Sequence, residues 1–227
     1  MSAPVAAASG PLLRAQVRLV AVMAGLMLLA LVLPLHTWHI ESRYYLPLHT
    51  TVEFVAVMVA FLVFATVWHT PSREGSASLL FIAVALFAAG WLDFSHALSF
   101  KGMPDMVTPS STEKGIVLWL AARFLVAVTL AGLSLAPELA VPSRRMRYDI
   151  LLAYAVVNGL VLGAVLFHES ELPATFVEGV GVTRAKVLAE WVITGLLVLA
   201  AWRYYRRARA TGDEFPALIF GDRKSVV

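Results

Sequence analysis

The stretch ASLLFIAVALFAAGWLDFSHAL, residues 77–98, decides the fold class of this chain. Its first fourteen residues carry no ionisable side chain, and Asp93 and His96 follow only near its end. A membrane-spanning helix needs about 20 mostly apolar residues, and this stretch has that length. The sequence therefore predicts a transmembrane helix that holds a carboxyl group and an imidazole near one of its ends.

The composition of all 227 residues indicates the same environment. Hydrophobic residues make up 59% of the chain, charged residues 15%, and the mean hydropathy is +0.78. A soluble domain carries about 45–50% apolar and about 25% charged residues, so this chain has too little charge to cover a water-facing surface. The absence of cysteine excludes disulfides, thiolate metal sites and a cysteine nucleophile. The net charge of +3 forms no basic face, so we expect no nucleic-acid partner.

Several stretches of this kind occur along the chain, and together they predict an all-α, polytopic membrane bundle of about six transmembrane helices embedded in the lipid bilayer. The predicted spans are residues 16–35, 49–68, 77–98, 115–135, 150–167 and 185–204. A cleaved signal peptide is the alternative for the first stretch. Its apolar run is longer than a usual signal core and no small-residue cleavage site comes after it, which favours an uncleaved helix.

Basic residues near the ends of the spans predict the orientation. The clusters RRMR (144–147) and RYYRRAR (203–209) lie on one side of the membrane in this topology, which places both termini in the cytoplasm. We expect residues 1–15 to be an N-terminal cytoplasmic tail and residues 16–209 to be the membrane-embedded domain. Residues 210–227 are expected to be the truncated start of a further helix or an artefactual tail.

Ionisable groups inside spanning helices are costly and mark function or internal pairing. Several such groups are spaced three or four residues apart, so that they share a helix face, and one aromatic residue lies one turn before an arginine. The residues are His49 and Glu53, Asp93 and His96, Trp119 and Arg123, and Lys186 and Glu190.

In the predicted topology every one of these charges falls in the outer half of the membrane. At about 1.5 Å per residue, Glu53 lies roughly 6 Å inward of His49, and Asp93 roughly 8 Å from the end of its span. Arg123 and Glu190 lie roughly 12 Å and 10 Å below the starts of theirs. This one-sidedness favours a polar cavity that opens outward, because charges that only hold helices together have no reason to avoid the inner half.

Simpler interpretations of the same residues remain open. His49 alone is typical of an interfacial histidine, and Lys186 with Glu190 is compatible with an ordinary helix-surface pair. Glu53 or Asp93 could pair with Arg123 or Lys186 and serve only to hold the helices of the bundle together. In that case the chain would be an assembly or scaffolding protein.

Four motifs in order resemble a bacterial family, the third type in the numbered series of membrane-associated sensor domains. They cover roughly residues 47–191. The matching residues are His49-Thr50-x-x-Glu53-Phe54, Asp93-x-x-His96-x-Leu98-x-Phe100-Lys101-Gly102-Met103, Trp119-Leu120-x-Ala122-Arg123, and Glu178-Gly179-x-Gly181-x-Thr183-x-x-Lys186 leading to Glu190-Trp191. The chain departs from the family pattern at Trp191, where a tyrosine is usual, and after the last arginine cluster, where the family continues with further helices.

The resemblance implies a multi-pass input module of the bacterial cytoplasmic membrane, and not an enzyme. Such modules are usually followed in the same chain by PAS, histidine kinase or diguanylate cyclase domains, and so belong to two-component or cyclic di-GMP signalling. We expect a homodimer that relays to such an output domain.

The residues and the resemblance together predict a sensor that binds an unknown small ligand or ion, and they name no cofactor. The predicted ligand-binding residues are His49, Glu53, Asp93, His96, Trp119, Arg123, Lys186 and Glu190. Arg123 is suited to anchoring an anionic group, whereas His49, Glu53, Asp93 and His96 are candidate ligands for a divalent cation, or titrating groups. The alternatives are a small-molecule or ion transporter or channel, and a haem- or metal-binding membrane protein.

Overall fold

The computed structural model describes residues 42–70, 76–105, 107–136, 139 and 142–211, together with scattered positions between 18 and 32. Within this part the main helices are α2 (Ser42–His69), α3 (Ala77–Ser99), α4 (Thr112–Leu135), α5 (Arg144–Phe167) and α6 (Arg184–Thr211). All five are long and apolar enough to cross a membrane, which confirms the all-α membrane bundle and five of the six predicted spans. The first predicted span, the residues 1–15 and the residues 212–227 lie largely or wholly outside the described residues.

Serine side chains fix where three of the helices begin. Ser76, Ser111 and Ser143 each accept a hydrogen bond from the backbone N–H three residues later, at 3.1, 3.0 and 3.2 Å. These bonds satisfy amide groups that have no partner inside the helix. Helix α2 begins earlier than predicted, at Ser42, and Pro47 lies inside it. The hydropathy pattern missed this start because the residues before Pro47 are polar and aromatic.

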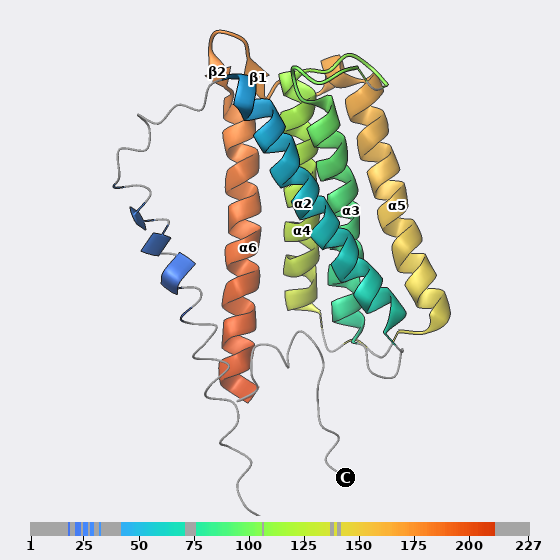
Figure 1. The fold of residues 1–227 in the computed structure, drawn as a ribbon. Helices are drawn as coiled ribbons and strands as arrows, with labels where there is room; N and C mark the ends of the chain where they lie inside the picture. Colours follow the sequence, from blue (N-terminus) through green and yellow to red (C-terminus); the bar gives the residue numbers. More distant parts are fainter. Residues whose placement is uncertain are drawn as a thin grey trace, which may run out of the picture.

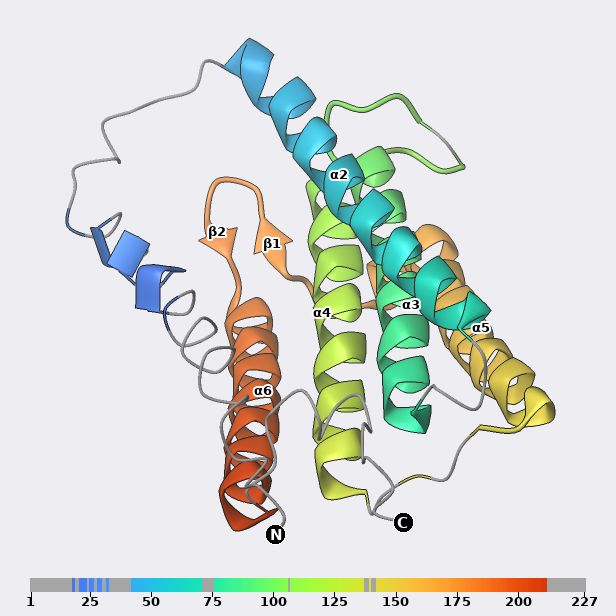
Figure 2. The same ribbon diagram turned by 60° about the horizontal axis from the view of Figure 1, so that its bottom comes forward.

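Helix α3 is the centre of the bundle and packs against α2, α4 and α5, while α6 packs against α4. Figures 1 and 2 show α2 crossing α3 and α4 obliquely, with α5 and α6 at opposite sides of the bundle. The crossing is close at Gly90, where an added Cβ would lie 2.9 Å from the ring of Phe61. Asn158 on α5 donates a hydrogen bond to the Ala88 carbonyl of α3 at 2.8 Å. The apolar outer faces of α2, α5 and α6 are exposed, as expected where lipid is the solvent.

The connections between helices differ at the two ends of the bundle. One end carries the loop after α3, the short helix η2 (Glu169–Glu171) and an antiparallel hairpin of β1 (Phe176–Val177) and β2 (Gly181–Val182). The sequence predicts that this end faces outward, and we call it the outer end. It is at the top in Figure 1. The opposite, inner end carries the ends of α2 and α4 and the start of α5.

Candidate functional site

An ion pair joins α3 to α4 in the outer half of the bundle. Nη2 of Arg123 donates to both carboxylate oxygens of Asp93, at 3.2 Å each. The Asp93 side chain is 8% exposed and that of Arg123 is 38% exposed, so the guanidinium still faces open space. The guanidinium carbon lies 5.5 Å from the ring centre of Trp119, one helical turn away. The stack and the ion pair together orient the arginine.

This pair lines a cavity of about 640 Å³ between α2, α3, α4 and α6. Asp93, Trp119, Arg123 and Glu190 supply polar groups toward its outer end. The rest of the wall is almost entirely apolar: Ala56, Val59, Ala60, Val63, Leu86, Ala89, Gly90, Val126, Ile193, Thr194 and Leu197. The cavity is therefore polar toward its outer end and apolar along the rest of its length.

A second cluster lies beside this cavity, where the outer parts of α2 and α3 meet. His49, Glu53 and His96 each offer one ligand atom, and these three atoms lie within 4.8 Å of one another. Nδ1 of His96 is 2.7 Å from the Gly115 carbonyl oxygen of α4. The ring of His49 stacks on Tyr45 with centroids 5.5 Å apart. We call His49, Glu53 and His96 the histidine cluster.

The last two predicted residues lie on the first turns of α6. Nζ of Lys186 is 2.6 Å from Oε1 of Glu190, and both side chains are partly exposed. Glu190 lines the cavity, whereas Lys186 does not.

The structure thus divides the eight predicted residues into neighbouring groups rather than one site. Asp93, Trp119, Arg123 and Glu190 belong to the cavity, His49, Glu53 and His96 form the histidine cluster, and Lys186 pairs with Glu190. Asp93 does not belong to the group that could hold a metal ion, and its carboxylate instead pairs with Arg123.

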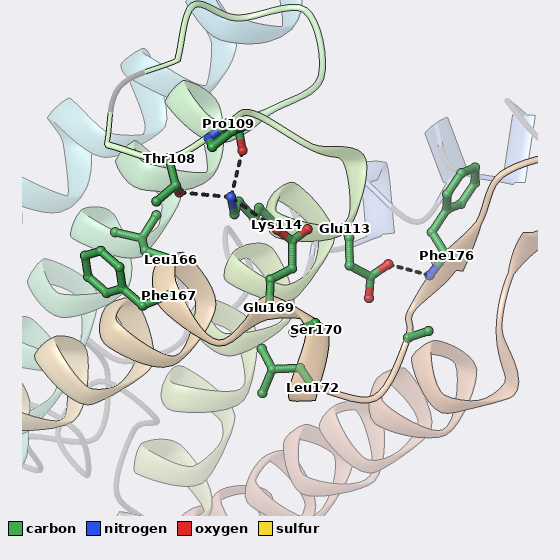
Figure 3. Close-up of a pocket in the computed structure, with 11 residues that line it drawn as sticks. Thr108, Pro109, Glu113, Lys114, Leu166, Phe167, Glu169, Ser170, Leu172 and Phe176 are labelled. Atoms are coloured by element: carbon green, nitrogen blue, oxygen red, sulfur yellow. Dashed lines mark hydrogen bonds and ion pairs between the residues drawn. The ribbon is translucent and has the colours of Figure 1, made fainter.

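A polar network at the start of α4, shown in Figure 3, was not predicted from the sequence. Lys114 is 3% exposed, and its ammonium group donates to the Thr108 hydroxyl at 2.9 Å and to the Pro109 carbonyl at 2.7 Å. It also forms an ion pair of 3.1 Å with Glu169 of η2. A buried, fully satisfied lysine ties the loop after α3 to the end of α5.

The neighbouring Glu113 holds the hairpin. Its two carboxylate oxygens accept hydrogen bonds from the backbone N–H groups of Thr175 and Phe176, at 2.5 and 2.8 Å. The pair Glu113-Lys114 lies only at the membrane entry of its span, so depth gave no reason to single it out. A useful signal was the pair of adjacent opposite charges in the first turn of the helix that Ser111 caps.

An exposed tether completes the outer end. Lys101 donates to Glu178 at the hairpin turn, at 2.7 Å. This hydrogen bond and the positive charge of Lys101 hold the pKa of the Glu178 carboxyl below its usual range. The turn requires glycine at residue 179, whose φ is +81°.

Comparison with known proteins gives the family but no close relative. A search of curated proteins and a search of solved structures returned no match. A family model described as a membrane-associated sensor domain, MASE3, matches residues 40–221, which include all the described helices from α2 to α6. The chain is therefore a multi-pass membrane protein that belongs to the MASE3 family of membrane-associated sensor domains.

Proposed function

We propose that this sensor domain detects a small carboxylate with an apolar tail, bound in the cavity between α2, α3, α4 and α6. The observation that carries the proposal is the partly open guanidinium of Arg123 at the polar end of an otherwise apolar cavity. A volume of about 640 Å³ lies within the range of roughly 300–1,000 Å³ typical of small-molecule sites.

Arg123 has donors to spare for an incoming anion. The described hydrogen bonds to Asp93 engage only Nη2, whereas a guanidinium has five N–H donors. A ligand carboxylate would take the free edge of the guanidinium and share it with Asp93, or displace Asp93. The charge of Glu190, across the cavity, is offset by Lys186 at 2.6 Å, which limits its repulsion of an anion.

The apolar wall favours a ligand whose carboxylate carries an alkyl tail. Val59 and Val63 of α2 face the cavity together with Ile193 and Leu197 of α6. An alkyl tail buried there gains up to about 0.8 kcal/mol per CH₂ group. The same apolar wall argues against a transport path for ions, since no described charged side chain lines the cavity on the inner side of the ion pair.

Signal relay would use α6, which packs against α4 along the cavity. At the inner end, Arg203 and Arg207 of α6 donate to the carbonyls of Ser134 and Ala136 at the end of α4, at 3.2 Å each. A ligand that closes the cavity would move the outer part of α6 about this fixed inner contact. It shifts the balance of states only by its differential affinity for them. The receiver would be a cytoplasmic PAS, histidine kinase or diguanylate cyclase domain, with a homodimer as the working unit.

Thermal unfolding of the chain in lipid nanodiscs tests the proposal, with acetate, hexanoate, octanoate and inorganic phosphate as probes. We expect hexanoate and octanoate to raise the unfolding midpoint more than acetate does. A free ligand concentration of about 100 times Kd raises the free energy of unfolding by about 2.7 kcal/mol. Arg123→Gln should abolish the increase, while Lys101→Gln, which changes an exposed outer lysine, should retain it. An equal increase in Arg123→Gln, or none with any probe, would contradict the proposal.

A further inference from the structure

The histidine cluster holds two nitrogen atoms that the described part of the structure leaves without partners. Nε2 of His49 and Nε2 of His96 are buried and form no hydrogen bond with any described residue. His96 as a whole is only 5% exposed. A buried polar atom without a partner costs free energy, so its retention needs an explanation.

The surroundings of His96 fix which of its nitrogens is available. Its Nδ1 lies 2.7 Å from the Gly115 carbonyl oxygen, which is an acceptor only, so Nδ1 carries the proton and donates it. Nε2 of the neutral ring is then an unprotonated acceptor. Helix α4 approaches closely here because residue 115 is glycine, where a Cβ would lie 3.1 Å from Phe100 and 3.5 Å from Nδ1 of His96. A backbone carbonyl that holds the far nitrogen of a histidine is the usual support for a metal-ligating ring.

Glu53 supplies the carboxylate of the histidine cluster. It lies one turn from His49 on α2 and is half-buried. Two cationic side chains of the outer half form ion pairs with other carboxylates, Arg123 with Asp93 and Lys186 with Glu190. Among the described residues Glu53 takes part in no ion pair. An unpaired carboxylate at membrane depth is costly, and a bound cation would compensate it.

The aromatic residues around the cluster limit what can bind. The His49 and His96 rings meet edge to face with centroids 5.5 Å apart. The centroid of the Phe100 ring lies 5.3 Å from that of His49 and 6.1 Å from that of His96. A porphyrin would have to separate two rings that are in contact, so the arrangement does not suit haem ligated by both histidines. A single ion does not require the two rings to separate in this way.

The donor set indicates the class of ion. Two imidazoles and one carboxylate are typical of Zn²⁺ and of other divalent first-row metals, whereas Ca²⁺ and Mg²⁺ prefer oxygen ligands alone. Bonds of about 2.0–2.2 Å place tetrahedral ligand atoms about 3.4 Å apart, somewhat closer than the 4.8 Å limit that these atoms satisfy here. Three protein ligands leave one position for water or an exogenous ligand.

We propose that His49, Glu53 and His96 bind one divalent first-row transition-metal ion, with Zn²⁺ as the reference case, beneath the aromatic cap of Tyr45 and Phe100. Tyr45, which stacks on His49, is exposed near the start of α2, toward the outer end. This site uses none of the residues that line the carboxylate cavity, and the domain would therefore respond to two chemically distinct signals.

Calorimetric titration of Zn²⁺ into the chelator-treated chain in nanodiscs, purified without a polyhistidine tag, tests this site. We expect one Zn²⁺ per chain. His49→Gln, Glu53→Gln and His96→Gln should each weaken binding by about 100-fold or more, since loss of a direct ligand exceeds the roughly 10–100-fold effect of outer-shell partners. Titration with Co²⁺ should give the visible d–d absorption of a four- or five-coordinate site, and the same substitutions should remove it.

Matched controls use histidines outside the cluster. His69→Gln and His168→Gln change exposed imidazoles and should leave the Zn²⁺ affinity unchanged. Retained secondary structure and elution volume show that a variant is folded, and Glu53→Gln, which keeps the volume of the side chain, provides the readout if a histidine variant unfolds. Absence of saturable Zn²⁺ binding, or unchanged affinity in folded His96→Gln and Glu53→Gln, would overturn the proposal. Arg123→Gln should not affect Zn²⁺ binding, so this proposal and the carboxylate site can fail independently.

Discussion

The outer and inner ends of the bundle are stabilised by different kinds of polar contact. At the inner end, arginines bond directly to backbone carbonyls where neighbouring helices finish: Arg147 to Trp68, Arg203 to Ser134 and Arg207 to Ala136. The outer end also has bonds from side chains to the backbone, but there ion pairs between side chains join neighbouring elements as well, Asp93 with Arg123 and Lys114 with Glu169.

The difference has a mechanical consequence. A helix carbonyl is a fixed acceptor, and a cation beside the end of a helix also gains from the helix dipole, so the inner contacts hold the helices in one register. A side-chain pair can open and exchange one partner for a ligand. We therefore interpret the inner end as the anchor of the sensor and the outer half as the part that changes.

Among these predictions, replacement of Arg123 should produce the largest loss in the free energy of unfolding. Arg123→Met leaves the buried Asp93 without its cation, and removing the partner of a buried charge costs up to about 3–5 kcal/mol. Unfolding in nanodiscs or mild detergent measures the loss.

The double variant Asp93→Leu with Arg123→Met distinguishes a role of the ion pair in stability from a role in ligand binding. Replacing both charges by apolar groups is often neutral or stabilising, so the double variant should recover most of the stability while it no longer responds to octanoate. A double variant as unstable as Arg123→Met would show that the pair is needed to hold the fold.

The lysines Lys114 and Lys101 at the outer end allow a comparison of a buried and an exposed contact, with smaller expected losses of stability. Lys114→Met should lower the free energy of unfolding by about 2–3 kcal/mol, because it leaves Oε2 of Glu169 and two loop oxygens without the Lys114 ammonium group. Lys101→Met removes an exposed contact, and we expect no measurable change. Chemical denaturation of both variants in the same lipid checks this. Equal losses would mean that burial does not distinguish the two lysines.

The smallest effect should appear in the titration of Glu178. Because Lys101 holds its folded-state pKa below the usual value, the tether contributes fully above the ordinary carboxyl pKa and is lost as the pH falls through the lowered one. Carboxyl NMR of Glu178 should show a titration displaced toward acid, and Lys101→Met should return it to the ordinary range. A titration that is the same in both proteins would exclude the tether in solution.

Much of the fold was predictable because hydropathy and length define a membrane helix almost by themselves. Helical spacing also indicated that Trp119 lies beside Arg123 and that Lys186 lies beside Glu190, and both contacts are present. Helix starts were less accurate, since the hydropathy of a window does not register a polar first turn such as that of α2.

The division of the site was not predictable, because spacing reports which residues share a helix face but not which group of a neighbouring helix each residue contacts. Asp93 and His96 lie one turn apart, yet Asp93 contacts Arg123 whereas His96 contacts the backbone of α4 at Gly115. Only the packing of α2 and α4 against α3 separates them. The burial of Lys114 depends in the same way on a loop and on η2, which are distant in sequence.

The most direct test measures two distances across the cavity by pulsed electron paramagnetic resonance. The chain has no cysteine, so label pairs can be introduced without background. Exposed positions Val52 and Leu188 report the outer halves of α2 and α6, and Leu62 and Val198 report positions further inward. Octanoate should shorten the outer distance and leave the inner one unchanged, and Arg123→Gln should remove the change. An unaltered outer distance, or equal changes at both levels, would contradict a fixed inner end and a responsive outer half.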